Sequence, residues 1–185
     1  FIGIAAVVAL ISMGAGLKSA VLGQFGALSV DKLTIQNKGT GFGPPGSTVV
    51  EKLNNHDIQI IENVRGVDLV IPRLIRIVKV EYNKIPTYTY ITDLPDNKEK
   101  ANLIYESFNV EVSEGRLLRP DDREKVLFGY DLAKTKTFEK DLSVGKTIKI
   151  NGKDFEIAGI LEKSSSLQLN NVIVIPTKDL QELLG

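Results

Sequence analysis

The side chains that could carry out chemistry are few in this sequence and do not form a recognisable site. His56 is the only histidine and there is no cysteine, which excludes disulfides, thiolate nucleophiles and cysteine-based zinc sites. An ordinary Ser-His-Asp triad or a multi-histidine metal site would have to rest on His56. This residue falls at an expected helix start, where we expect a surface or capping role. The sequence therefore predicts no catalytic residue.

Two other patterns resemble ligand sites only superficially. Asp121, Asp122 and Glu124 form an acidic cluster, but a calcium loop needs spaced ligands and a glycine at its bend. We interpret this cluster as a solvated turn. The run GTGFG at 39–43 resembles a phosphate-binding loop, but a proline pair follows at 44–45 in place of Gly-Lys-Ser/Thr and a helix start. We expect no metal, no nucleotide and no other cofactor.

Aromatic side chains are the remaining candidates for contact with a ligand or partner. Tyr88 and Tyr90 lie on the same face of an expected strand, where they could stack on a ligand or pack against neighbouring strands. Phe42 lies in a loop over 39–47 that is rich in glycine and proline and cannot hold a strand ladder. We predict a contact surface made of Tyr88, Tyr90 and Phe42.

The first residues form an apolar segment, and its nature decides whether the rest of the chain is attached to a membrane. The run from Phe1 to Leu17 carries no charged residue, and a membrane-spanning helix needs about 17–25 apolar residues. We predict that residues 1–22 are the end of a first transmembrane helix. A buried helix of a soluble domain is the alternative, and a signal peptide is disfavoured because no basic region precedes the run.

Small residues recur in this helix at spacings of three or four, so they fall near one face: Ala5, Ala9, Ser12, Gly16 and Ala20. Close backbone approach over small side chains is one way in which membrane helices associate. The pattern is explained equally well by the ordinary abundance of Gly and Ala in such helices.

Composition describes a folded domain without a strong electrostatic preference. The chain has 23 basic and 23 acidic residues, so no overall field recruits nucleic acid or an anionic surface. Apolar residues make up 43% of the chain, which is typical of a folded protein. We expect no nucleic-acid partner.

Periodicity and turn residues predict the elements of the first half of the chain. Thr48-x-x-Glu51 is a possible capping box, but Asn54 or Asn55 is an equally good cap and better explains an apolar face of Ile58, Ile61 and Val64. Gly66 would then end the helix. The expected elements are a half-buried strand over 31–38, a loop over 39–47, a helix ending near 64, and either one strand over 67–81 bent at Pro72 or two strands there.

The second half alternates strands and helices. Asn151-Gly152 tolerates the positive φ angles of a type I′ turn and predicts a hairpin over 147–161. Asp96-x-x-Glu99 predicts a capped helix running to about Phe108. The expected strand over 85–92 has Thr87, Thr89 and Ile91 on one face. In the capped helix we expect Ala101, Ile104 and Phe108 to face inward. The other expected elements are a turn at 120–122, a strand over 126–128, a helix after Gly129 with Leu132 and Ala133, a buried strand over 172–175 and a last helix from 176–177.

Several pieces of the sequence resemble one family when taken in order. They are GIAAVVALISMGAGLKSAV at 3–21, GVDLVIP at 66–72, EGR at 114–116, VLFGYDLA at 126–133, VGKTIKINGKDFEIAGIL at 144–161 and VIVIP at 172–176. Their order resembles the extracytoplasmic (MacB-like periplasmic) core domain of MacB/FtsX/LolC-type ABC transporter permeases.

The resemblance implies an α+β fold that lies between the first and second membrane helices of a permease. It implies a porter-like βαβ part over 23–83 and 164–185, with a smaller strand-rich part inserted over 84–163. The family continues past the position of Gly185 through another strand and the second membrane helix, so we expect the porter-like part to be incomplete here or to end early.

The resemblance also implies a mechanical role at the cell membrane, with this domain on the extracytoplasmic side. An ABC ATPase subunit or domain would hydrolyse ATP, and a homodimer of permeases would transmit the motion to export or extract a substrate or to act on an extracytoplasmic partner. A membrane-anchored sensor or binding module without an ATPase is the alternative. A third candidate function is a membrane-anchored hydrolase, which would be supported only by hydrolytic activity that is lost in His56→Ala.

Overall fold

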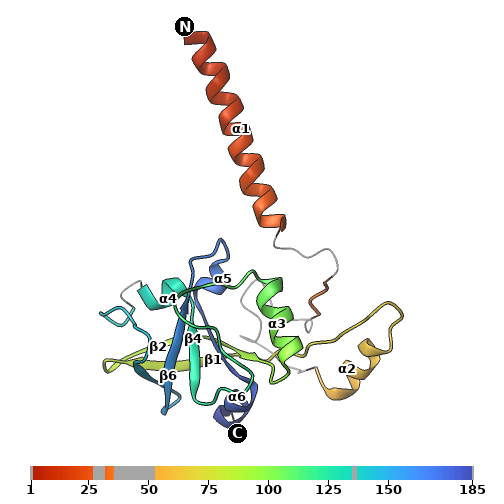
Figure 1. Ribbon diagram of the computed structural model, residues 1–185, viewed down its shortest axis with the longest axis vertical. Helices are drawn as coiled ribbons and strands as arrows, with labels where there is room; N and C mark the ends of the chain where they lie inside the picture. The colour runs from red at the N-terminus through yellow and green to blue at the C-terminus, as the bar shows by residue number, and fades with distance from the viewer. Residues whose placement is uncertain (1, 27–31, 36–52, 135–136, 185) are drawn as a thin grey trace.

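The computed structural model describes residues 2–26, 32–35, 53–134 and 137–184. It shows an α+β fold in which helix α1, Ile2–Gly26, stands clear of a body built on a seven-stranded sheet (Figure 1). The side chains described in α1 are solvent-exposed, among them Ile4, Leu10 and Met13. Within the described residues, no helix has the length and apolar character needed to cross a membrane. The predicted helix is confirmed, and its reading as the end of a transmembrane span stays a prediction.

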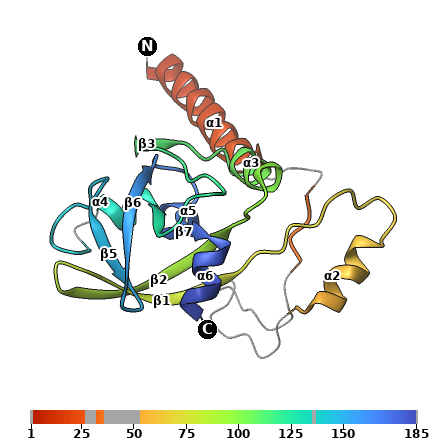
Figure 2. The same cartoon turned by 60° about the horizontal axis from the view of Figure 1, so that its bottom comes forward.

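Residues 53–74, which we call the arm, project from the body beside the sheet (Figure 2). The arm contains helix α2, Asn55–Glu62, whose N-cap is Asn54. The Asn54 side chain accepts hydrogen bonds from the backbone N–H groups of His56 and Asp57, and the Asp57 side chain accepts one from Asn54 N. The later of the two predicted helix starts is therefore confirmed; Thr48 and Glu51 lie outside the described residues.

Two strand predictions around the arm are wrong in the described residues. Residues 32–35 form no strand, and Leu33 and Ile35 are exposed. Residues 67–74 are also irregular, so of the one bent strand or two strands expected over 67–81, only the part from Ile75 onward is formed. Branched residues favour extended backbone, but a strand also needs a partner with which to form a ladder. Helix α2 ends at Glu62 with Asn63 as its C-cap, so Val64, which was predicted on its apolar face, and Gly66, which was predicted to end it, both lie beyond the helix. Val64 is exposed.

The first hairpin joins β1, Ile75–Tyr82, to β2, Ile85–Leu94, through Asn83 and Lys84, which both have positive φ. The predicted alternation along β2 is confirmed, because Thr89 and Ile91 are buried and Tyr88 is exposed. Two-residue hairpin turns of this kind twist the strands in the sense that a closed sheet requires.

The other elements follow in chain order: α3 Lys98–Ser107, β3 Val112–Gly115, β4 Lys125–Phe128, α4 Tyr130–Lys134, β5 Thr147–Ile150, β6 Lys153–Leu161, α5 Leu167–Asn170, β7 Val172–Pro176 and α6 Thr177–Leu184. Strand pairing runs β3-β6-β4-β7-β2-β1-β5, and β5 also pairs with β6. The pairings β6-β4-β7-β2-β1-β5-β6 therefore close into a barrel, with β3 added at the edge of β6. This barrel draws strands from both predicted parts of the chain, and the division at 84 and 163 stays a prediction.

The barrel interior is filled by side chains, as in other small barrels. Val80, Ile91, Phe128, Phe155 and Ile173 belong to this core and are almost completely buried. Tyr82 closes one side by placing its ring edge-on to Phe138, with 6.0 Å between the ring centroids. Inward-facing side chains of β2 and β6, such as Ile91 and Phe155, therefore meet in this core.

A second, smaller core lies between the outer surface of the barrel and α3. Leu94, Ala101 and Leu127 are among its buried members. Asn97 caps α3 by accepting a hydrogen bond from Lys100 N, so the predicted cap at Asp96 is wrong by one residue. Ala101 faces inward as predicted, but Phe108 is exposed. Both Asp and Asn are good caps, so composition alone does not choose between neighbours.

Turns and close approaches fix the remaining local structure. Asn151 and Gly152 have φ angles of 47° and 88°, which confirms the predicted hairpin turn between β5 and β6. Gly129 lies between β4 and α4, where an added Cβ would come within 2.4 Å of Leu169 O. Glycine at this position allows the backbone of the 129–130 turn to pack directly on α5.

Candidate functional site

The predicted aromatic surface lies on the outer face of the first hairpin. Tyr88 is 73% exposed, and Tyr90 next to it on the same face is partly covered. The register places Lys79 opposite Tyr88 and Ile77 opposite Tyr90, and Ile77 is also exposed. The structure thus brings an aliphatic side chain from the neighbouring strand beside the two tyrosines, a contact that the sequence of β2 alone does not predict. Phe42 and the loop over 39–47 lie outside the described residues.

His56 is exposed in the first turn of α2, where its backbone N–H donates to Asn54 Oδ1 at 2.8 Å. This position agrees with the predicted surface role. Among the residues that the structure describes, no group of three or more His, Asp or Glu side chains is arranged to hold a metal ion.

The acidic cluster at 121–124 is divided among different contacts. Asp122 accepts two hydrogen bonds from the Arg116 guanidinium, at 2.6 and 2.7 Å, and a third from Arg119 N. Hydrogen bonding to Arg116 lowers the pKa of Asp122, and the same bond raises the pKa of Arg116. Asp121 is exposed. The turn is solvent-exposed at Asp121 and Glu124, as predicted, whereas Asp122 is held by its ion pair with Arg116.

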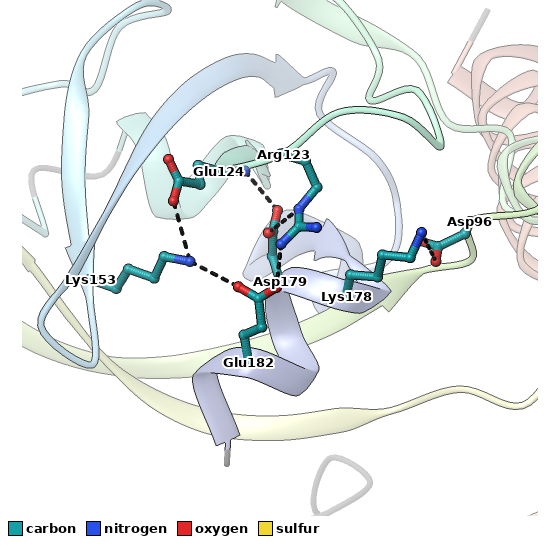
Figure 3. A network of polar contacts seen from close by, with 7 residues as sticks. All are labelled: Asp96, Arg123, Glu124, Lys153, Lys178, Asp179 and Glu182. Carbon is teal, nitrogen blue, oxygen red and sulfur yellow. Dashed lines mark hydrogen bonds and ion pairs between the residues drawn. The ribbon is translucent and has the colours of Figure 1, made fainter.

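Helix α6 is fastened to the barrel by a network of polar contacts (Figure 3). Asp179 is fully buried and accepts hydrogen bonds from Arg123 Nε and Glu124 N, both at 2.7 Å. Lys153 Nζ lies 3.3 Å from both Glu124 Oε1 and Glu182 Oε2. The contacts tie α6 to the segment before β4 and to the start of β6.

Arg123 also donates to Glu182, and this bond lowers the pKa of Glu182. A separate pair, Lys178 and Asp96 at 3.3 Å, links α6 to the residues before α3. These outer pairs are solvent-exposed, so each contributes little to stability by itself. The buried Asp179 carboxylate is the centre of the network.

A second buried carboxylate, Asp93 near the end of β2, is only 3% exposed. Its Oδ1 accepts from Leu74 N at 2.8 Å and from Arg73 Nε at 3.2 Å. Its Oδ2 lies 2.9 Å from Thr177 Oγ1, at the start of α6. Within the described part of the chain, every buried side-chain polar atom has a hydrogen-bond partner.

Sequence reasoning missed Asp93 and Asp179. Asp93 follows the apolar alternation of β2, and a charged residue at the buried end of a strand was a signal that could have been noticed. Asp179 stands in the first turn of a helix, where acidic residues are common for electrostatic reasons. Its partner Arg123 lies far away in the sequence, so no local pattern predicts the pair.

Comparisons with known proteins place these features in a family. The family model described as "MacB-like periplasmic core domain" matches residues 1–185. The chain is 31% identical over 187 aligned positions to an uncharacterized ABC transporter permease of Methanocaldococcus jannaschii, MJ1507, covering 100% of this chain and 44% of that protein. It is 27% identical to the pyoverdine export ATP-binding/permease protein PvdT of Pseudomonas aeruginosa, covering 95% of this chain and 26% of that protein.

Solved structures show the same fold. The extracellular domain of the ABC-type transporter YknZ from Gram-positive bacteria matches with a TM-score of 0.53 and 18% identity, covering 70% of this chain and 65% of that one. The periplasmic region of MacB from Actinobacillus actinomycetemcomitans also gives a TM-score of 0.53 at 18% identity, covering 74% of this chain and 61% of that one.

The chain spans less than half the length of either sequence relative. Both relatives are permease proteins by description, and the solved structures are extracytoplasmic regions of ABC-type transporters. Because the family model covers residues 1–185, the chain belongs to the family of MacB-like periplasmic core domains, the extracytoplasmic domains of ABC transporter permeases.

Proposed function

We propose that this domain transmits ATPase-driven motion from the membrane to an exported or extracted substrate or an extracytoplasmic partner. The supporting observation is that one family match runs through both the apolar helix α1 and the folded barrel. A helix with apolar side chains exposed all round requires a non-aqueous or protein environment. The barrel, in contrast, is packed around its own core.

In this proposal α1 enters the membrane, and movement there reaches the barrel through the arm. ATP hydrolysis takes place in a separate ABC ATPase subunit or domain, and the domain itself catalyses no reaction. Two permeases form a homodimer whose extracytoplasmic domains change their separation. The relative PvdT is described as an export protein with an ATP-binding part, which supports export as the direction for this chain.

Purification of the whole permease tests the proposal. We expect the permease to co-purify from membranes with an ABC ATPase and to be required for full ATP hydrolysis in nanodiscs. A permease that is recovered without an ATPase, under conditions that preserve membrane complexes, would contradict the proposal.

That contrary result would favour a second candidate function, a membrane-anchored extracellular sensor or binding module. The exposed surface formed by Tyr88, Tyr90 and Ile77 is the observation that favours it. Tyrosine supplies large contact area with a polar end and is common in binding surfaces. The same surface would serve an exporter as the contact for its extracytoplasmic partner.

A further inference from the structure

Asp93 occupies a position at which three parts of the molecule meet. At the base of the arm, Arg73 Nε and Leu74 N donate hydrogen bonds to Asp93 Oδ1. On the other side, Asp93 Oδ2 is within hydrogen-bond distance of the Thr177 hydroxyl at the start of α6. The Asp93 backbone N–H donates to Leu74 O at 3.1 Å. One buried carboxylate on β2 therefore contacts both the arm and α6.

The arm has few other attachments to the barrel in the described residues. None of the residues of α2 is buried. Lys100 Nζ of α3 donates to Val70 O at 3.2 Å, and the remaining polar contacts of the arm with the body lie at residues 73–74. Arg73 Nη2 reinforces them by donating to Thr92 Oγ1 at 2.8 Å and to Asp93 O. The direction in which the arm leaves the barrel thus depends on this junction.

Thr177 fixes the orientation of the carboxylate from the opposite side. Its Oγ1 lies 2.9 Å from Asp93 Oδ2 and 2.8 Å from Leu94 O, so the single hydroxyl proton has an acceptor at either atom. Thr177 itself is held in place because α6 is fastened through the buried Asp179 and the buried Leu180. Rotation of the Asp93 side chain would take the Oδ1 acceptor away from Leu74 N and Arg73 Nε at the base of the arm, which is costly in a buried place. Thr177 would keep Leu94 O as its acceptor.

We propose that Asp93 is the positioning residue that holds the arm at a fixed direction relative to α6, so that movement of the arm is passed into the barrel. This inference rests on the proposed function for its use of motion, but the geometry of the junction can be tested without ATP. Thr177 and Arg73 act through Asp93, from α6 and from the arm respectively.

The first test measures distances within one domain of the whole permease in nanodiscs, without nucleotide. Because this stretch has no cysteine, spin labels can be placed at Gln59→Cys on α2 and Gln181→Cys on α6, both exposed. A second pair, Asn102→Cys on α3 and Gln181→Cys, reports on the body alone. Both pairs should give narrow distance distributions in the otherwise unmodified protein.

Arg73→Gln and Thr177→Val each remove one side of the junction, and Asp93→Ala removes both. We expect these variants to broaden the Gln59–Gln181 distribution and to leave the Asn102–Gln181 distribution unchanged. Lys178→Ala, next to Thr177 but paired with Asp96 at the surface, is the matched control and should leave both unchanged. Unchanged distance distributions in Arg73→Gln and Thr177→Val would overturn the proposal, because the junction at Asp93 would then not position the arm. Equal broadening of both label pairs would also overturn it, because these residues would then matter only for folding.

The second test adds ATP and measures the distance between Asn102 labels of the two permeases. We expect the shift seen in the unmodified protein to be lost in Arg73→Gln and retained in Lys178→Ala. Retention of the shift in Arg73→Gln would overturn the role in transmission. Absence of any shift in the unmodified protein would instead contradict the proposed function, while the nucleotide-free distances would still decide the geometry of the junction.

Discussion

Asp179 of α6 accepts a hydrogen bond from Arg123 Nε at 2.7 Å, and this contact joins the last helix to the segment that enters β4. The carboxylate is fully buried, whereas the Arg123 side chain is 46% exposed. The pair therefore holds a buried acceptor at the inner end and a solvated cation at the outer end, which keeps the desolvation cost below that of a wholly buried pair.

Removal of this acceptor should destabilise the domain. In Asp179→Ala the Glu124 N–H loses its hydrogen bond to the buried carboxylate, and a hydrogen bond to a charged group contributes about 1.5–3 kcal/mol. Chemical denaturation followed by circular dichroism measures the loss. Glu182→Gln, in the same network but exposed, is the control and should have a smaller effect. Equal losses in the two variants would show that burial of Asp179 is unimportant.

Replacement of Gly129 tests the close approach of the turn after β4 to α5. An added Cβ would lie 2.4 Å from Leu169 O and 2.5 Å from Asn170 O. Because backbone atoms cannot yield as a flexible side chain would, Gly129→Ala should cost about 1–3 kcal/mol, as overpacking does. Gly16→Ala, where the added Cβ meets open space, should cost nothing. Thermal unfolding of both variants measures the difference.

The ion pair between Asp122 and Arg116 should make stability depend on pH in the acid range. The pKa of Asp122 is lowered in the folded protein, chiefly by its hydrogen bond to Arg116. Its contribution to stability is therefore complete above the ordinary value of about 3.9 and is lost as the pH falls through the lower folded value.

Asp122→Asn should accordingly reduce stability at neutral pH and flatten the fall in stability below about pH 4. Denaturant titrations between neutral and acid pH measure this slope. Asp121→Asn, exposed in the same turn, is the control and should change the free energy of unfolding at neutral pH by no more than about 0.5 kcal/mol. A profile for Asp122→Asn as steep as that of the unmodified protein would contradict the role given to this pair.

Substitution on the aromatic surface should separate function from folding. Tyr88 is 73% exposed, so Tyr88→Ala should change the free energy of unfolding by no more than about 0.5 kcal/mol. We expect the same variant to reduce transport by the whole permease, because it removes contact area for a substrate or partner. Phe108→Ala, an exposed aromatic at the end of α3, is the control and should leave transport unchanged. Equal transport by both variants would exclude this surface.

Local patterns predicted the parts of the fold that local forces determine. The period-two alternation placed Thr89 and Ile91 in the core, and Asn151-Gly152 specified a hairpin because few residue pairs tolerate two positive φ angles. The start of α2 followed from one asparagine cap. The order of several short sequence motifs also predicted that the chain belongs to the family of MacB-like periplasmic core domains, which the comparisons show.

Features that depend on distant partners were not predictable in the same way. Residues 67–74 have the composition of a strand, but the described residues offer them no ladder. Closure of the barrel requires β5 to pair with both β1 and β6, and nothing in the β5 sequence specifies two partners. Asp93 and Asp179 acquire their roles from Arg73, Thr177 and Arg123, so their importance appears only when the chain is folded.

The separation of two such domains in a working permease tests the central claim most directly. Spin labels at Asn102→Cys, one on each permease of the ATPase complex in nanodiscs, report this distance with and without ATP. Transmission of ATPase-driven motion requires a nucleotide-dependent shift in the inter-subunit distance. A distance that is the same with and without ATP, in a complex that hydrolyses ATP, would contradict that claim.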